Sequence, residues 1–168
     1  MRGRGTGIAP LFFYILNKGF TMVADDEENN KKKFGDKEKR KLEKDFKEGI
    51  EKYTKDDLEK VLKSEDEIKK KFKEIPEKLK KMIKQVQLLM ELLKDYWDGE
   101  YKEIPWASIA SIVFCLVYFI SPLDLIPDAI PVIGYIDDAY VVKLTLEFIA
   151  DDLKKYCSYK EYDLKEYF

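Results

Sequence analysis

A run of 20 uncharged residues, from Ile104 to Leu123, limits what this chain can fold into more than any other feature. A helix of about 20 apolar residues can cross the hydrocarbon core of a bilayer. Prolines shorten this helix, because Pro105 belongs at a helix start and Pro122 disfavours helix at the residue before it. The remaining 106–121 helix would be about 24 Å long, against a core of about 30 Å. The sequence therefore favours a re-entrant hairpin, or a helix buried on all sides, over a clean single span.

Small residues follow one face of this helix, where Ala107, Ser111 and Cys115 recur at four-residue spacing. Small side chains in that register let a second helix backbone approach closely, as in helices that pack inside lipid. The same register also suits tight packing in a core away from lipid. The sequence therefore predicts a helix-packing face and leaves its surroundings open.

A second apolar pattern covers residues 138–156. Its apolar seam consists of Val142, Leu146, Ile149, Leu153 and Tyr156. Charged residues line the opposite side, so this helix should not cross lipid by itself. Paired with the preceding helix, it would complete an apolar helical hairpin over residues 104–160.

Proline and aspartate dominate the connection between these helices, and we expect it to form a stiff elbow. Its candidate residues are Ser121, Pro122, Asp124, Pro127, Asp128, Pro131, Gly134, Asp137 and Asp138. Ser121 to Asp124 has the layout of a capped helix start, and Asp137 and Asp138 suit the positive end of the last helix.

Four of these residues are carboxylates without a basic neighbour in sequence: Asp124, Asp128, Asp137 and Asp138. Carboxylates held close together in a dry site repel one another, which raises the pKa of at least one. Water, a lysine from the first half of the chain, or a bound hard cation could relieve this repulsion. Oxygen ligands alone would select Mg²⁺ or Ca²⁺. The sequence leaves a structural elbow, a cation site and a protonation-sensitive site as alternatives.

The first half of the chain is rich in lysine and glutamate, and we expect residues 25–41 to be disordered or frayed. Apolar residues then recur at helical spacing over 42–97. Thr54–Asp57 and Ser64–Glu67 are typical of helix caps, and Asp98-Gly99 should end the last of these helices. Acids are interleaved with the lysines, which favours solvated helix faces over nucleic-acid binding. A charged helical arm over 42–103 is the resulting prediction.

Composition narrows the chemistry. The chain has no histidine, so Ser-His and Cys-His catalysis and histidine metal sites are excluded. The two cysteines form neither a disulfide framework nor a metal motif and suit a reducing cytoplasm. A net charge of −2 gives no overall attraction to nucleic acid. No catalytic residue is predicted.

The two termini complete the expected organisation. Residues 1–41 form an N-terminal extension, and residues 161–168 form a tail. The start, "MRGRGTG" followed by "IAPLFFYIL", is typical of a targeting segment or of an extension upstream of a true start at Met22.

Residues 95–139 closely resemble the YkvA-like family of small helical domains, most specifically at "YFISPLDLIPD" and "PVIGYIDD". Weaker similarity extends over about 56–159. Ala129 departs from the family pattern, which favours a bulkier apolar residue. The resemblance implies a membrane-associated helical domain, often predicted to be embedded in lipid, and implies no reaction.

We therefore expect an all-α, non-enzymatic protein associated with the lipid bilayer. Lysines on both flanks of the hairpin would keep both ends cytoplasmic. Helices 42–97 would mediate contact with a protein partner or self-association. Two alternatives stay open: a soluble helical adaptor whose hairpin is its own core, and an Mg²⁺- or Ca²⁺-dependent enzyme that uses the aspartate elbow.

Overall fold

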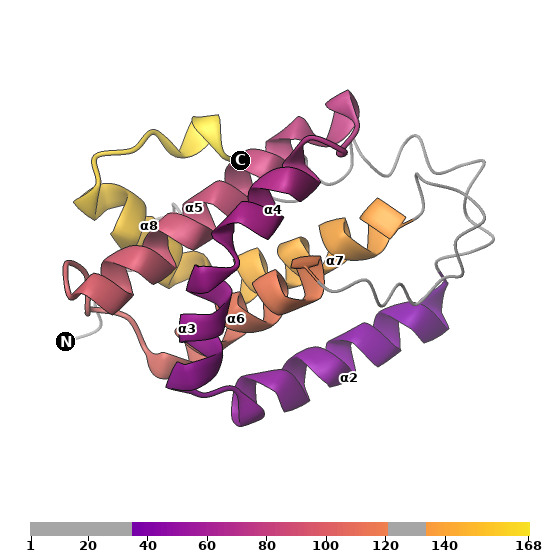
Figure 1. The fold of residues 1–168 in the computed structure, drawn as a ribbon, viewed down its shortest axis with the longest axis horizontal. Coiled ribbons are helices and arrows are strands. Elements are labelled where there is room, and N and C mark those ends of the chain that lie inside the picture. Colours follow the sequence, from indigo (N-terminus) through magenta and orange to yellow (C-terminus); the bar gives the residue numbers. More distant parts are fainter. Residues whose placement is uncertain (1–34, 121–133) are drawn as a thin grey trace, which may run out of the picture.

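The computed structural model describes residues 35–120 and 134–168, and these form seven α-helices and no strand (Figure 1). The all-α prediction is confirmed for this part of the chain. The helices are α2 (Asp36–Lys52), α3 (Lys55–Lys63), α4 (Glu65–Phe72), α5 (Lys80–Asp98), α6 (Trp106–Ile120), α7 (Gly134–Phe148) and α8 (Ala150–Tyr159), with short 3₁₀ turns η2 (Glu77–Leu79) and η3 (Leu164–Glu166).

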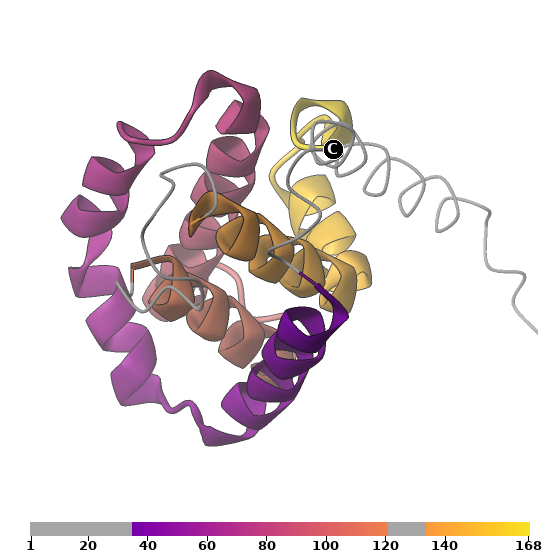
Figure 2. The ribbon, with the colours of Figure 1, turned by 90° about the vertical axis from the view of Figure 1, so that its right-hand side faces the viewer.

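Helix α6 is the central element, because α2, α3, α4, α5 and α7 all pack against it. Figure 2 shows it inside a ring of the other helices. Ten of its 15 residues are buried. The sequence predicted its extent to within one residue. Of the alternatives left open, the helix buried on all sides is the arrangement found.

Within residues 35–120 and 134–168, no helix combines the length and the apolar character that a membrane crossing requires. The sequence already disfavoured a clean single span, and α6, with 15 residues from Trp106 to Ile120, has about the length expected.

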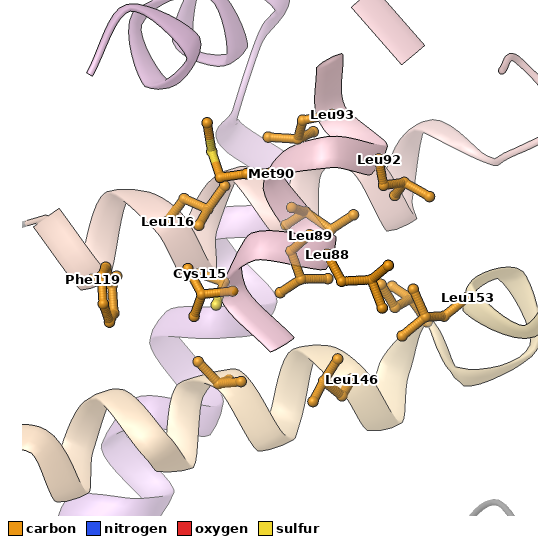
Figure 3. Close-up of a cluster of buried hydrophobic side chains, with 14 of the residues drawn as sticks. Leu88, Leu89, Met90, Leu92, Leu93, Cys115, Leu116, Phe119, Leu146 and Leu153 are labelled. Atoms are coloured by element: carbon orange, nitrogen blue, oxygen red, sulfur yellow. The ribbon is translucent and has the colours of Figure 1, made fainter. Parts of the chain in front are cut away.

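Buried leucines of α5 contribute to the core (Figure 3). Leu88, Leu89, Leu92 and Leu93 of α5 belong to one cluster with Cys115 and Leu116 of α6, Leu146 of α7 and Leu153 of α8. Burying each such leucine contributes roughly 1.5–3 kcal/mol before entropy is counted.

The last helical stretch differs from the single helix expected over residues 138–156. It begins at Gly134 and consists of α7 and α8, which meet at Ile149. The seam is confirmed, because Val142, Leu146, Ile149, Leu153 and Tyr156 are all buried.

The charged helices pack onto the apolar ones instead of projecting as an arm. Leu42 and Phe46 of α2, Leu58 of α3 and Ile68 of α4 are buried in the same cluster as α6. The tail also packs on the bundle, where Gln85 donates to the carbonyl of Tyr167. The boundaries proposed from the sequence stay predictions, although the described residues on both sides of 103 and 160 share one core.

Two helix starts differ from the expectation. Residues 36–41, expected to be frayed, belong to α2, because Glu38 accepts from the Gly35 amide and burial of Leu42 anchors the helix beyond them. Ser64 does not cap α4, because its hydroxyl donates to the Lys60 carbonyl instead.

Two other signals are confirmed. The Thr54 amide and hydroxyl donate to Asp57 at 3.0 and 2.8 Å and cap α3. Gly99 ends α5 with φ of +88°, a left-handed conformation that favours glycine.

Helices α2 and α6 approach closely at Gly49. A Cβ atom at this position would lie 2.3 Å from Cδ2 of Phe114, closer than side chains tolerate. Phe46 packs edge-on against the same ring, at 5.4 Å between centroids. A glycine inside a helix is the signal that points to such a contact, and the sequence reasoning missed it.

We predict that Gly49→Ala destabilises the protein. Alanine is about 1 kcal/mol better than glycine in a helix, but overpacking a core costs roughly 1–3 kcal/mol. Urea unfolding measures the net loss. Lys47→Ala, an exposed substitution in the same helix, is the control and should change little.

The mechanism is tested by shortening the opposing side chain. In a Phe114→Ala background, Gly49→Ala should cost less, because the ring atoms that the new Cβ meets are gone. An equal cost in both backgrounds would contradict the contact.

Candidate functional site

A buried ion pair joins three helices at one end of the bundle. Lys71, in the last turn of α4, places its Nζ 2.7 Å from Oδ2 of Asp138 in α7. The Lys71 side chain is 22% exposed and that of Asp138 only 4%. The same ammonium donates to the carbonyl of Phe119 in the last turn of α6 and lies 4.5 Å from the centroid of its ring.

The helix ends explain why a lysine and an aspartate meet here. The last carbonyls of a helix lack intrahelical partners, and a cation near them is favourable. Lys71 supplies that cation to α6, and the ring of Phe72 packs against that of Phe119 at 5.8 Å. Asp138 lies near the amino end of α7, where a carboxylate is favourable.

This geometry identifies one source of counter-charge for the elbow. Of the three alternatives, water, a cation and a lysine from the first half of the chain, the structure places the lysine beside Asp138. The sequence could not identify Lys71, because it lies in "KKKFK", where any of four lysines could face inward.

The other predicted elbow residues are only partly described. Ser121, Pro122, Asp124, Pro127, Asp128 and Pro131 lie outside the described residues. Gly134 begins α7, and Asp137 and Asp138 are adjacent and buried, at 1% and 4% exposed. Among the described residues, no three acidic or cysteine side chains are arranged to hold a metal ion. The Mg²⁺ or Ca²⁺ site of four aspartates therefore stays a prediction.

The small-residue face is divided. Ala107 is exposed at the start of α6, whereas Ser111 and Cys115 are buried. The Ser111 hydroxyl donates to the carbonyl of Ser108. The Ser108 hydroxyl donates to Asp152 at 2.6 Å.

Cys115 lies close to the ion pair but is not a nucleophile. Burial raises the pKa of its thiol to about 12; the Thr145 hydroxyl opposes this shift, and the charge of Asp138 adds to it. Burial likewise raises the pKa of Cys157 to about 11. Both cysteines are free and buried, and their thiols stay protonated at neutral pH.

A second polar cluster, on α5 and α8, holds the end of the chain. It consists of Glu91, Asp95, Tyr156, Lys160 and Tyr162. Lys160 lies 2.8 Å from Glu91 and 3.0 Å from Asp95. The Tyr156 hydroxyl donates to Asp95 and that of Tyr162 to Glu91, both at 2.7 Å.

The hydrogen bonds in this cluster favour a charged lysine and neutral tyrosines. Bonds to Glu91 and Asp95 raise the pKa of Lys160, and the bond to Glu91 raises the pKa of Tyr162 to about 12. Sequence reasoning missed the cluster. Its signal was four-residue spacing on two helices, Glu91 with Asp95 and Tyr156 with Lys160.

Comparison with known proteins identifies the family to which this sequence is similar. Residues 108–144, which include most of α6 and the first part of α7, match a family described as "Protein of unknown function (DUF1232)". Over 77 residues the chain is 32% identical to the "Uncharacterized membrane protein YkvA" of Bacillus subtilis, covering 46% of this chain and 73% of that protein. This chain belongs to the DUF1232 family.

The YkvA-like resemblance is thereby confirmed. No solved structure is significantly similar to this DUF1232 protein. Asp138 lies inside the stretch that matches the family, and Lys71 lies outside it.

We predict that Lys71→Met strongly destabilises this DUF1232 protein. Removing one partner of a buried ion pair typically costs about 3–5 kcal/mol, because the other charge stays buried. Urea unfolding measures the loss. Adding Asp138→Asn to Lys71→Met should restore part of it.

Lys69→Met is the matched control. Lys69 is 61% exposed and pairs with Glu65 on the surface, so its loss should change the stability little. Equal effects of the two lysine substitutions would contradict a structural role of the buried pair.

A pH prediction follows from Cys115. Its pKa is higher in the folded protein, so the folded state favours the protonated thiol. That contribution is complete below the ordinary thiol pKa of 9.0 and is lost as the pH rises toward about 12. Between about pH 8 and about pH 10, wild type should therefore lose stability more steeply than Cys115→Ser. Urea midpoints at both pH values test this, and identical slopes would refute it.

Proposed function

We propose that this DUF1232 protein is a non-enzymatic helical protein of the membrane surface. In this proposal α6 and α7 form an apolar hairpin that serves as the protein's own core. The chain that joins them, residues 121–133, contacts the lipid.

The observation that carries the proposal is the enclosure of α6. Five helices pack against it, and its buried residues contact other parts of the same chain. Lipid is therefore not needed to cover this helix. In a protein of this kind, the outer surface of the bundle would contact the membrane, and helix α6 would not.

Two observations support lipid as the partner. The sequence of residues 121–133 contains seven aliphatic residues, three prolines and no lysine or arginine. The relative in Bacillus subtilis is named a membrane protein. Because α6 ends and α7 begins at one end of the bundle, this segment joins two helices that already pack together.

A cytoplasmic location of both flanks belongs to the same proposal. Lysines precede and follow the apolar hairpin, and such lysines are favoured on the cytoplasmic side. They include Lys94 and Lys102 before it and Lys143 and Lys154 after it.

The chemistry of the described residues supports a non-enzymatic role. The chain has no histidine, and burial keeps both thiols protonated. The enzyme alternative requires a divalent cation near Asp138, where the ammonium of Lys71 already lies.

One exposed feature favours the adaptor as a second candidate. Trp97 is 44% exposed at the end of α5 and borders a hollow of about 470 Å³ with Leu62, Lys63 and Lys94. Exposed tryptophan is enriched at protein interfaces. A protein partner bound there would make α3 and α5 the interaction surface.

Vesicle flotation tests the leading proposal. We predict that the full chain floats with vesicles of phosphatidylcholine and phosphatidylglycerol. Ile126→Ser with Ile130→Ser should reduce the bound fraction at least about tenfold, since each removes an aliphatic side chain that could enter the lipid. Trp97→Ser, which removes an exposed apolar side chain from another part of the bundle, is the control and should float like wild type.

Two results would contradict the proposal. If the wild-type chain does not float, the membrane is excluded as its partner. Loss of flotation in Trp97→Ser alone would move the contact to the hollow between α3 and α5.

A further inference from the structure

Lysines concentrate where α4 turns into α5. Residues 69–84, "KKKFKEIPEKLKKMIK", contain eight lysines and two acids. The acids of α4 lie in its first turn, at Glu65, Asp66 and Glu67, and its lysines lie in the last turn. Along α4 the acids and the lysines therefore lie at opposite ends, whereas Glu77 pairs with Lys80 in the turn that follows.

Most of these lysines face outward. Seven are exposed, and we call the six from Lys70 onward the lysine patch: Lys70, Lys73, Lys78, Lys80, Lys81 and Lys84. Lys71 instead points inward to Asp138. Buried apolar residues of the same segment, Ile75, Leu79 and Met82, hold the turn on the core, which fixes the patch in place.

The patch lies at the end of the bundle where α6 finishes and α7 starts. Lys71 contacts Phe119 and Asp138, so the last turn of α4 is adjacent to both helix ends. Figure 1 shows the α4–α5 turn and the start of α7 on the same side, and Figure 2 views this end directly. The other termini of these helices lie away from it.

We propose that the lysine patch binds the anionic headgroups of a lipid surface. This inference rests on the proposed function and names the lipid class that it requires. An anionic leaflet attracts lysines held near it, and a basic cluster strengthens anchoring by apolar groups. Here the segment that carries the patch contacts the last turn of α6 and the first part of α7 through Lys71.

A nucleic acid is the competing partner for a lysine cluster, and the structure favours lipid. Binding of single strands uses exposed aromatic rings beside the basic residues. Among the described residues, the large exposed apolar side chains are Trp97, Phe148 and Tyr159, which lie near the carboxyl ends of α5, α7 and α8. The patch lies near the amino ends of α5 and α7.

Cosedimentation with two kinds of vesicle tests the inference. The probes are phosphatidylcholine alone and phosphatidylcholine with phosphatidylglycerol, each at low and high salt. The patch variant carries Lys73→Gln, Lys78→Gln, Lys80→Gln and Lys81→Gln. The matched control carries Lys47→Gln, Lys52→Gln, Lys55→Gln and Lys63→Gln, which are exposed positions on α2 and α3. Circular dichroism confirms that both variants are folded.

We expect wild type and the control to bind the anionic vesicles tightly and to be released by salt. The patch variant should bind them at least about a hundredfold more weakly, since each lysine near an anionic surface contributes about fivefold. A short single-stranded RNA should bind wild type much more weakly than the anionic vesicles do.

The contradicting results separate the two proposals. Equal, salt-insensitive binding to both vesicle types would overturn the inference and keep the proposed function. No binding to either vesicle would overturn both. Equal losses in the two lysine variants would show that general charge, not the patch, is responsible. If the RNA binds more tightly than the anionic vesicles, nucleic acid instead of lipid is the partner of the patch.

Discussion

Helix α6 has to be covered on every side, and the other helices are arranged to do so. Its 15 residues, about 22 Å long, are apolar enough to need burial and too short for a bilayer core of about 30 Å. The charged helices provide this burial, because each of them packs a narrow apolar stripe against α6. Leu42, Leu58 and Ile68 belong to these stripes and are almost completely buried. Half of a highly charged chain thus serves to enclose one apolar helix.

Enclosure creates an electrostatic problem that the Lys71–Asp138 pair solves. Packing α4 against α6 brings Lys71 to the Phe119 carbonyl of α6 and to Asp138 of α7. One ammonium then serves Phe119 and Asp138 at once. The polar cluster of α5 and α8 is arranged in the same way, because Lys160 pairs with both Glu91 and Asp95. Each buried acid described in these two clusters has a lysine that is distant in sequence.

Local signals predicted much of the fold. Prolines and the uncharged run located α6, and the caps at Thr54 and Gly99 depend only on neighbouring residues. Other features depend on tertiary packing, which local patterns do not contain. Lys71 looks like its neighbours until α4 is placed on α6, and Gly49 matters only because Phe114 faces it. Hydropathy indicated that residues 104–123 need covering, and it could not distinguish lipid from five helices of the same chain.

If the chain itself covers α6, this helix should be the one most protected from amide hydrogen exchange when no lipid is present. Native-state amide hydrogen exchange measures this directly. In detergent-free buffer, the amides of α6 from Ile109 to Phe119 should exchange slowest of all, at rates set by global unfolding. Adding vesicles should leave these rates unchanged. Rapid exchange along α6 in buffer, slowed only when vesicles are added, would show that lipid rather than the chain itself covers this helix, and the account would be wrong.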